Sequence, residues 1–405
     1  MTLSDKYGAI YLKIHQLTMS IPWWAHVILL WVLVVSVLTG IGIVSLKFVD
    51  LREGYHTSVG VSPASLPGLW ARWDSGYYLG IARSGYSAIP NSYGFFPLYP
   101  SLIAILSRVF RVSLATSGLF ISSISYLGAA ILIYLIALRM KADKAYAFRS
   151  VVFLLVFPSA FFFIAIYAES LTLVLSLLAV YFIFLPKPKY AISGSFSGLS
   201  ALVRPTGFLV YSVALVKMFT QKNYHKKSVL AASIGLMLSF LGIAFYVLFV
   251  YSQTGSWFEI LESTAAWQRQ LQIPIITYLK SLRIVFLGNN VPNDWFLYVI
   301  NIIDLIFTSF AIAIIGIAIW KSRSGKFNWG LTTYMICYLV IMLSSQGLEV
   351  VPLWGMTRWV ALLFPMYFIL ADLFKKTRSF LTVSGLMMGI QIVFVIWWVS
   401  GRWIG

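Results

Sequence analysis

Residues 23–49 read WWAHVILLWVLVVSVLTGIGIVSLKFV, and this run decides the class of fold. It exceeds the roughly 20 residues that a helix needs to cross about 30 Å of hydrocarbon. It is also too long for the core of a signal peptide and lacks a small-residue cleavage site. We therefore expect it to remain in the protein as a membrane anchor.

The rest of the chain has the same character. Of its 405 residues, 60% are hydrophobic and only 10% are charged, and the mean hydropathy is +0.87. No long polar segment is available to fold as a separate water-soluble domain. Residues 1–405 are therefore predicted to form a single all-α integral-membrane domain.

Apolar runs recur along the whole sequence. They predict about eleven membrane crossings, which makes the protein multi-pass. The expected helices cover residues 23–48, 114–138, 150–167, 169–185, 191–203, 206–219, 228–252, 293–320, 327–345, 358–374 and 379–399. The pair at 191–203 and 206–219 is short and interrupted by Pro205 and Gly207, which is typical of a broken or re-entrant element that lines a cavity.

The formal net charge of +18 is explained by topology. The basic stretches RMKADKAYAFR, PKPKY, KMFTQKNYHKK, KSRSGK and KKTR alternate with the apolar runs, as the positive-inside rule requires of cytoplasmic connections. Lipid headgroups rather than nucleic acid are then the expected partners of these residues. The same topology places three loops outside, at residues 49–113, 253–292 and 346–357, and we expect residues 95–112 to form a juxtamembrane or re-entrant helix on the outer side.

The large first external loop contains the stretch WARWDSGYYLGIARSGYS, residues 70–87. Its carboxylate, Asp74, is surrounded by aromatic residues, among them Trp73, Tyr77 and Tyr78. A carboxylate beside rings that can stack on sugar faces suits a general base that takes a proton from a sugar hydroxyl. The alternative is an ion pair of Asp74 with Arg72 or Arg83 in a folded loop.

Five further candidates fall on the same external side. Glu169 interrupts a long apolar run, where its carboxylate needs a polar cavity, an arginine partner or a helix start. Arg204 lies in the broken pair, and Trp267 and Arg269 lie in the second external loop. Arg358, at a helix mouth, could direct two donors to a phosphate or could extend to the interface beside Trp354 and Trp359.

The remaining residues suggest one structural acid and no metal, nucleotide or cofactor site. Asp304 lies inside an apolar run and is expected to have a structural role. No Asp-x-Asp pair or ligand-spaced cluster of histidines and acids is present, so no metal is expected, and the lack of a Walker motif argues against nucleotide binding. No cofactor is predicted, and an activated substrate would have to arrive in the lipid.

Several blocks resemble a known family. RWDSGYYLGIARSGY followed by FFPLYP is similar to the first external loop of the PIG-V-type mannosyltransferases, which belong to the class C, multi-spanning glycosyltransferases. FPSAFFFIAIYAESLTLVLSLLAVY, SGLSALVRPTGF, TGSWFEILESTAAWQRQ and MTRWVALLFPMYF resemble later blocks of that family in the same order.

The resemblance implies a class C bundle that performs an inverting transfer of mannose. The donor would be polyprenyl-phosphate mannose, the acceptor a hydroxyl of a lipid-linked or glycan molecule, and the site would face the external or luminal side. Asp74 corresponds to the acid regarded as the base in this class, and Arg358 falls in a block where a donor-phosphate contact is expected, with Arg204 as a second candidate. The membrane would be the plasma membrane of a prokaryote or the endoplasmic reticulum of a eukaryote.

Two other functions remain open from the sequence. A class C transferase for a different sugar would share every feature above. A transporter or lipid flippase would instead place ionisable residues along a path near the bilayer midplane. The grouping of the candidates on one side favours an enzyme.

Overall fold

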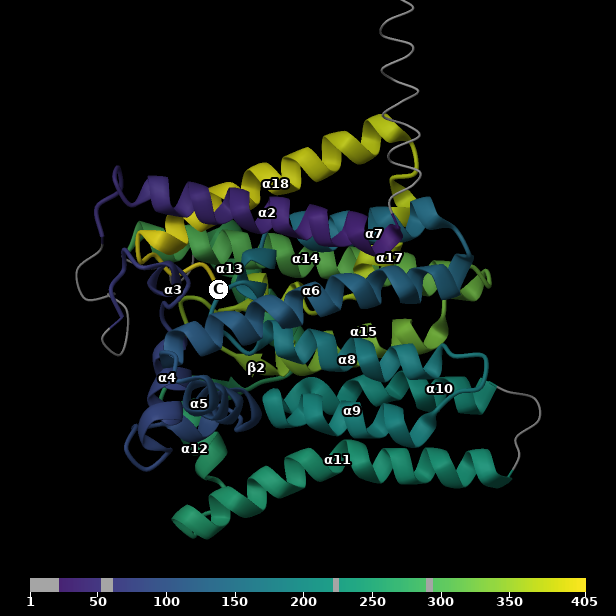
Figure 1. Ribbon diagram of the computed structural model, residues 1–405, viewed down its shortest axis with the longest axis horizontal. Coiled ribbons are helices and arrows are strands. Elements are labelled where there is room, and N and C mark those ends of the chain that lie inside the picture. Colours follow the sequence, from purple (N-terminus) through teal and green to yellow (C-terminus); the bar gives the residue numbers. More distant parts are fainter. Residues whose placement is uncertain (1–21, 52–60, 221–225, 289–293) are drawn as a thin grey trace, which may run out of the picture.

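A computed structural model describes residues 22–51, 61–220, 226–288 and 294–405. These residues form a bundle of helices that run mostly along one direction (Figure 1). The described strands form a two-stranded antiparallel sheet, in which β1 (Gln270–Leu271) pairs with β2 (Ser345–Gln346). The predicted all-α class is therefore confirmed.

Five helices in the described part of the chain are long and apolar enough to cross a membrane. They are α2 (Trp23–Ser45), α6 (Leu114–Lys141), α11 (Lys226–Thr254), α14 (Trp295–Arg323) and α18 (Thr377–Val399). Each coincides with a predicted span to within a few residues. The chain is an integral membrane protein.

Shorter helices fill the bundle between them. They are α7 (Lys144–Val156), α8 (Glu169–Ile183), α9 (Tyr190–Val203), α10 (Ser212–Thr220), α15 (Trp329–Ser344) and α17 (Pro365–Leu373), together with the 3-10 segments η2 (Ala160–Phe163) and η3 (Pro205–Tyr211). These helices are too short to count as spans by length alone, so the number of about eleven crossings stays a prediction.

Two predicted helices are wrong in part: 150–167 in its second half, and 358–374 in its middle, where residues 361–364 separate α16 (Met356–Val360) from α17. Helix α7 ends at Val156, and Phe157 is already extended. Pro158 explains the break, because proline lacks a backbone N–H and disfavours helical geometry in the residue before it. The following segment is buried without regular helix, and the N–H of Ile166 donates to the carbonyl oxygen of Trp70 at 3.0 Å.

Glycines allow α9 and α11 to approach closely. A Cβ atom on Gly194 would lie 2.1 Å from the carbonyl oxygen of Gly235, and one on Gly198 would lie 2.2 Å from that of Leu238. Gly194 and Gly198 are four residues apart, so they share one helix face, as in other membrane helix pairs that pack through small residues. This contact fixes α9, whose end carries Arg204.

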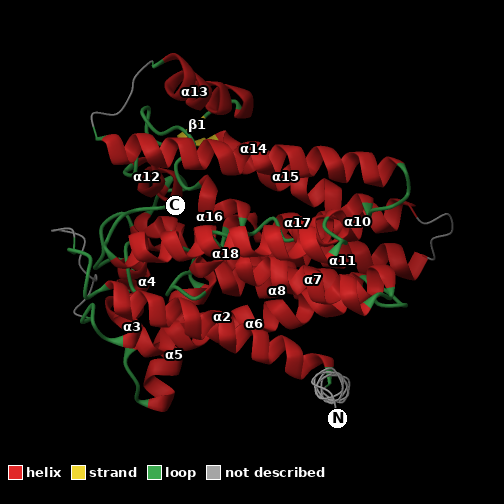
Figure 2. Cartoon of the chain, turned by 90° about the horizontal axis from the view of Figure 1, so that it is seen from above, coloured by secondary structure: helices red, strands yellow, loops and turns green. Residues whose placement is uncertain are grey.

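The two ends of the bundle differ. One end, here called the site end, carries α3 (Leu66–Leu69), α4 (Ser75–Ser84), α5 (Leu98–Phe110), α12 (Glu259–Ala265) and α16 (Met356–Val360), and it also receives the C-terminus (Figures 1 and 2). Helix α5 follows α4 and lies across the direction of the long helices (Figures 1 and 2). This arrangement agrees with the expectation that residues 95–112 form a helix beside the bundle rather than a crossing.

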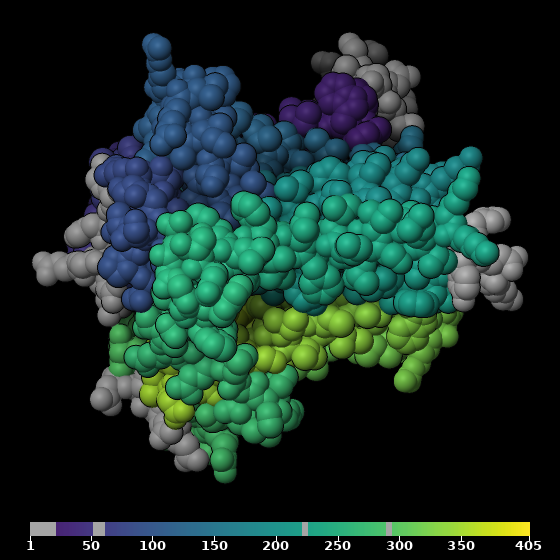
Figure 3. All heavy atoms as spheres, turned by 90° about the horizontal axis from the view of Figure 1, so that it is seen from below, coloured from purple at the N-terminus to yellow at the C-terminus, as the bar shows by residue number. Residues whose placement is uncertain are grey.

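The second predicted loop, 253–292, covers one flank of the site end. The loop contains α12, and the short 3-10 segment η1 (Ser92–Gly94) packs against that helix. Helix α13 (Pro274–Leu287) comes later in the loop and packs beside α14 and α15. Figure 2 shows α13 at the edge of the molecule, and Figure 3 shows the green atoms of this loop against the yellow-green atoms of α15. Strand β1 connects the loop to β2.

The opposite end, here called the basic end, is held by one carboxylate. Asp372 of α17 accepts from Lys141 of α6 at 2.5 Å, from Lys321 of α14, and from Lys375 at 3.0 Å. Its side chain is only 9% exposed. The predicted basic connections that follow α6, α14 and α17 therefore meet at a single acid, which ties three helices together.

Replacing Asp372 by Asn should lower the free energy of unfolding by about 2 kcal/mol or more, because the lysines lose the anion that compensates their partly buried charge. Thermal unfolding of the purified protein in detergent measures this change. Glu349→Gln is the matched control, since Glu349 is 68% exposed and its contact with Lys280 is 3.5 Å long. Equal melting temperatures for the two variants would contradict the proposed role of Asp372.

Candidate functional site

Asp74 is presented by a turn at the start of α4. The preceding residue, Trp73, has a positive φ of 50°, a conformation uncommon for a large side chain and often found at functional sites. The backbone N–H of Asp74 donates to the hydroxyl of Tyr167 at 3.2 Å. The carboxylate makes no capping bond to its own helix and is 25% exposed, so it remains accessible from the site end.

The partner of Asp74 is Arg358. Nη1 of Arg358 donates to Oδ2 of Asp74 at 2.6 Å, and Nε lies 3.3 Å from Oε1 of Glu169. The arginine side chain is only 6% exposed. Arg358 is thus a buried ionic partner rather than an interfacial arginine that extends to the surface, and Asp74 does not depend on Arg72 for charge compensation.

Arg72 has other partners. It is buried, its Nη1 donates to the carbonyl oxygen of Gly68 at 2.6 Å, and its Nη2 donates to that of Val399 at 3.3 Å. The indole N–H of Trp398 donates in turn to the carbonyl oxygen of Leu69. These bonds attach the loop that carries Asp74 to the end of α18.

Glu169 and Arg204 complete the ionic network. Glu169 is the first residue of α8, its side chain is 1% exposed, and it accepts from Nη1 of Arg204. Arg204 is the extended residue between α9 and η3, where Pro205 prevents the helix from continuing. Both predicted features of Glu169, a helix start and an arginine partner, are therefore present.

Arg269 approaches the same network but lacks a carboxylate partner among the described residues. Its guanidinium stacks on the ring of Trp359 at 4.5 Å, and Nη2 donates to the carbonyl oxygen of Trp354 at 3.2 Å. Nη1 is buried with no hydrogen-bond partner in the described part of the chain. Burial, followed by the positive charge of Arg358, lowers the pKa of Arg269 to about 10.

The predicted aromatic residues lie around these charges. The ring of Tyr77 stacks on Phe95 at 4.4 Å, and Trp267 packs edge-on against both rings. Tyr78 is buried and packs edge-on against Phe95 at 5.1 Å. The Tyr77 and Trp267 rings therefore pack against other protein side chains and form part of the wall of the site.

Two aromatic residues at the centre were not predicted. The rings of Tyr167 and Trp403 lie 5.2 and 5.6 Å from the guanidinium carbon of Arg358, and Trp403 also contacts Trp73 edge-on. The position of Tyr167, two residues before Glu169, could have indicated its role. Trp403 reaches the site only because the C-terminal segment folds back onto it. Gly405 of that segment packs so closely on Arg358 that a Cβ atom added to the glycine would lie 3.0 Å from Cβ of Arg358.

Asp304 positions the helix that carries Arg358. Buried in α14, it accepts from the backbone N–H and the hydroxyl of Thr357 at 2.7 and 2.6 Å, and from the N–H of Gly355 at 3.3 Å. Gly355 has φ 91°, which favours glycine. The expected structural role of Asp304 is confirmed, and its partners, Gly355 and Thr357, lie at the N-terminal end of α16.

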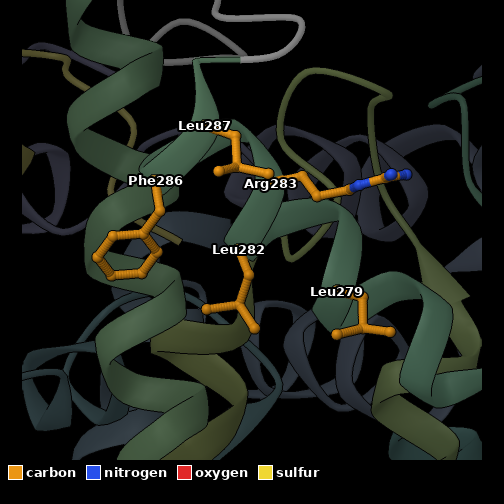
Figure 4. Close-up of a pocket in the computed structure, with 5 residues that line it drawn as sticks. All are labelled: Leu279, Leu282, Arg283, Phe286 and Leu287. Carbon is orange, nitrogen blue, oxygen red and sulfur yellow. The ribbon is translucent and has the colours of Figure 1, made fainter.

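A cavity on α13 is a poor candidate for chemistry. It is lined by Leu279, Leu282, Arg283, Phe286 and Leu287, and Figure 4 shows these side chains spread over one helix. The lining contains no carboxylate or hydroxyl that could act as a base. The network of Asp74, Glu169, Arg204 and Arg358, with Arg269 beside it, is the stronger candidate site.

The fold and this network define an integral membrane protein with a cluster of charged side chains at one end of a helical bundle. Residues 58–310 match the family model described as Mannosyltransferase (PIG-V). Because the match covers more than half of the chain, the protein belongs to this family. The resemblance seen in the sequence blocks is confirmed, although Arg358 lies beyond the matched residues.

The solved structures that resemble the chain are distant. ArnT from Cupriavidus metallidurans in the apo state is 14% identical to this chain, with a TM-score of 0.47. The match covers 83% of this chain and 59% of the ArnT chain. The oligosaccharyltransferase AglB from Archaeoglobus fulgidus, in complex with an inhibitory peptide and a dolichol-phosphate, is 12% identical with a TM-score of 0.42, covering 91% of this chain and 55% of its own. No curated protein sequence matches. The chain thus spans less than two thirds of the length of these structures.

The positioning role of Asp304 is testable without an activity assay. Asp304→Asn keeps one acceptor oxygen but replaces the other by an amide nitrogen, a donor that faces the N–H of Gly355 or of Thr357, so we expect the free energy of unfolding to fall by about 1 to 3 kcal/mol. Thr308→Val is the control, because Thr308 is equally buried one turn along the same helix and its hydroxyl bonds only to the carbonyl oxygen of Asp304. Thermal unfolding in detergent measures both, and a loss for Thr308→Val as large as that for Asp304→Asn would contradict the role.

Proposed function

We propose that this protein is a glycosyltransferase that moves mannose, with inversion, from a polyprenyl-phosphate mannose donor to a hydroxyl of a lipid-linked or glycan acceptor, on the external or luminal face of its membrane. The observation that carries the proposal is the contact between Asp74 and Arg358. It joins one partly exposed carboxylate to a buried arginine that is 284 residues away in the sequence. This contact supports a pairing of one base, Asp74, with one phosphate-binding cation, Arg358.

The chemistry needs few groups. The carboxylate of Asp74 takes the proton of the acceptor hydroxyl while the oxygen attacks the anomeric carbon. The bond between that carbon and the phosphate oxygen breaks, and polyprenyl phosphate leaves with the electron pair. Attack from the face opposite the phosphate inverts the anomeric configuration. The protein then has to supply one base and positive charge at the leaving phosphate.

The charges of the site suit such a donor. Arg204, Arg269 and Arg358 bring three positive charges beside Asp74 and Glu169, and the nearby carboxylate of Asp304 already accepts hydrogen bonds from Thr357 and Gly355. A buried excess charge is costly until an anion compensates it. A phosphate that binds Arg358 would compete with Asp74 for the guanidinium, and so release the carboxylate toward the acceptor as the donor enters.

Arg269 is the second phosphate contact in this proposal, and Arg204 has a supporting role. The Nη1 atom of Arg269 still needs an acceptor, whereas Arg204 is already bonded to the buried Glu169. Trp73, Tyr77, Tyr78 and Trp267 would shape the space that the sugar enters. Mannose itself rests on the family alone, and transfer of a different sugar by the same groups is the alternative.

The experiment is transfer of label from radiolabelled polyprenyl-phosphate mannose to a membrane lipid extract by the purified protein in lipid. Asp74→Asn should reduce transfer by a factor of about 100 or more, because it removes the base while nearly preserving shape. Asp50→Asn, which changes an exposed acid near the same loop, is the control and should leave the rate unchanged.

The linkage of the product tests the stereochemistry, and donor binding measured in parallel separates lost chemistry from lost folding. Activity of Asp74→Asn close to that of the wild type, in protein that binds donor normally, would show that the catalytic assignment is wrong. Absence of transfer by the folded wild type with any polyprenyl-phosphate sugar would contradict the donor class.

A further inference from the structure

The segment that follows α18 packs against the candidate site and carries Trp403. Its backbone turns at Gly401, which has φ 79°, and the N–H of Arg402 donates back to a carbonyl oxygen of α18 at 3.0 Å. Further on, Gly405 lies so close to Arg358 that an added Cβ atom would be 3.2 Å from the backbone nitrogen of the arginine. Figure 2 shows the C-terminus beside α16, the helix that contains Arg358. Trp403 is therefore held between a turn and a close backbone contact.

The side chain of Trp403 connects the parts of the candidate site. Its ring lies 5.6 Å from the guanidinium carbon of Arg358. It also packs edge-on against Trp73, the residue before Asp74 in the chain, at 5.1 Å. On another side it stacks on Trp354 at 5.8 Å, and the carbonyl oxygen of Trp354 accepts from Nη2 of Arg269. Trp403 thus links the turn that presents the base to Arg358 and, through Trp354, to Arg269.

The indole N–H of Trp403 is an unused hydrogen-bond donor. The residue is partly exposed, but its nitrogen is buried and has no partner in the described part of the chain. The same is true of the indole nitrogen of Trp359, on whose ring Arg269 stacks, and of Nη1 of Arg269 itself. Buried donors without an acceptor are costly and uncommon in folded proteins. Three of them in one group of contacting side chains indicate a bound ligand that supplies acceptors.

The chemistry of these groups favours an anion. Indole and guanidinium nitrogens donate hydrogen bonds and accept none. The oxygens of an ionised phosphate only accept, and hydrogen bonds to a charged acceptor are the stronger kind. A sugar hydroxyl would satisfy one donor but would bring a proton that needs an acceptor of its own. A phosphate beside Arg358 and Arg269 is therefore the ligand group that suits the indole of Trp403.

We propose that the indole N–H of Trp403 donates a hydrogen bond to the phosphate of the polyprenyl-linked donor while Arg358 and Arg269 pair with its charge. This inference rests on the proposed function, and it adds a neutral donor to the two arginines. No covalent bond changes at Trp403. As the bond to the sugar breaks, negative charge grows on the phosphate, so a fixed N–H at this position stabilises the leaving group.

Binding of a polyprenyl phosphate, compared with the uncharged polyprenol of the same length, tests the proposal by native mass spectrometry of the purified protein. Trp403 is replaced by 3-benzothienylalanine, which nearly preserves the shape of the indole but has sulfur in place of the N–H, and separately by Phe. Both changes should weaken binding of the polyprenyl phosphate by about tenfold, because a hydrogen bond to a charged group is lost. Binding of the polyprenol should stay unchanged.

Trp397→Phe is the matched control. Trp397 is also a partly buried tryptophan, six residues earlier in the chain, and its ring packs on Phe296 and Phe394. We expect both affinities of this variant to equal those of the wild type. A loss of polyprenyl-phosphate binding as large as that of Trp403→Phe would show a general effect of removing an indole from this region, and would overturn the proposal.

The benzothienylalanine protein separates the N–H from the ring. Wild-type affinity in that protein would overturn the proposal, even if Trp403→Phe bound weakly through lost packing. Equal losses for the polyprenol and the polyprenyl phosphate would overturn it too, since the phosphate would then have no part in the effect. Wild-type protein that prefers the phosphate, with variants that bind it normally, leaves the proposed function standing while this inference fails. If the wild type shows no preference for the phosphate, the donor class fails and the inference fails with it.

Transfer by the same proteins gives a second measurement. The KM for the polyprenyl-phosphate sugar should rise in both Trp403 variants, while the KM for the acceptor stays near the wild-type value. A rise in the KM for the acceptor alone would contradict a contact between Trp403 and the donor phosphate.

Discussion

Charged side chains inside a membrane protein must compensate one another, and the site end of this protein is built around that requirement. Asp74, Glu169, Arg204 and Arg358 form one continuous ionic network, with three of the four side chains largely buried. Each of the four belongs to a different part of the chain. A network of this kind is costly if one partner is missing, so the segments that carry its members are held together.

The regular helices alone could not bring these groups together. Asp74 follows Trp73, whose backbone has the positive φ of the left-handed region. Arg204 lies where Pro205 ends α9, and Arg358 follows Gly355, which also has a positive φ, by three residues. The buried irregular segment after α7 contributes Tyr167, which contacts both Asp74 and Arg358. Breaks in the helices therefore form the site, while the glycine contact between α9 and α11 and the lysines around Asp372 hold the rest of the bundle in place.

Much of this was readable from the sequence, because hydrophobic length and basic loops report directly on membrane helices. The helix boundaries near Trp23, Leu114 and Thr377 followed from apolar runs, and the gathering of Asp74, Glu169, Arg204, Arg269 and Arg358 at one end followed from the alternation of sides. The pairings did not, because a salt bridge over 284 residues leaves no local pattern. Tertiary packing also determines the contact of Asp304 with Thr357 and the return of Trp403 to the site. The break after α7 is different, because Pro158 is a local sequence signal for the end of a helix.

The central claim is that the donor phosphate binds beside Asp74, on the arginines that face it. The most direct measurement is a structure of the protein in a lipid environment with a polyprenyl phosphate bound, in which the distances from the phosphorus to the three arginines can be read. The account predicts a phosphate in contact with Arg358 and Arg269, with Asp74 turned away from Arg358. A phosphate on the α13 cavity beside Arg283, with the contact between Asp74 and Arg358 unchanged, would contradict it.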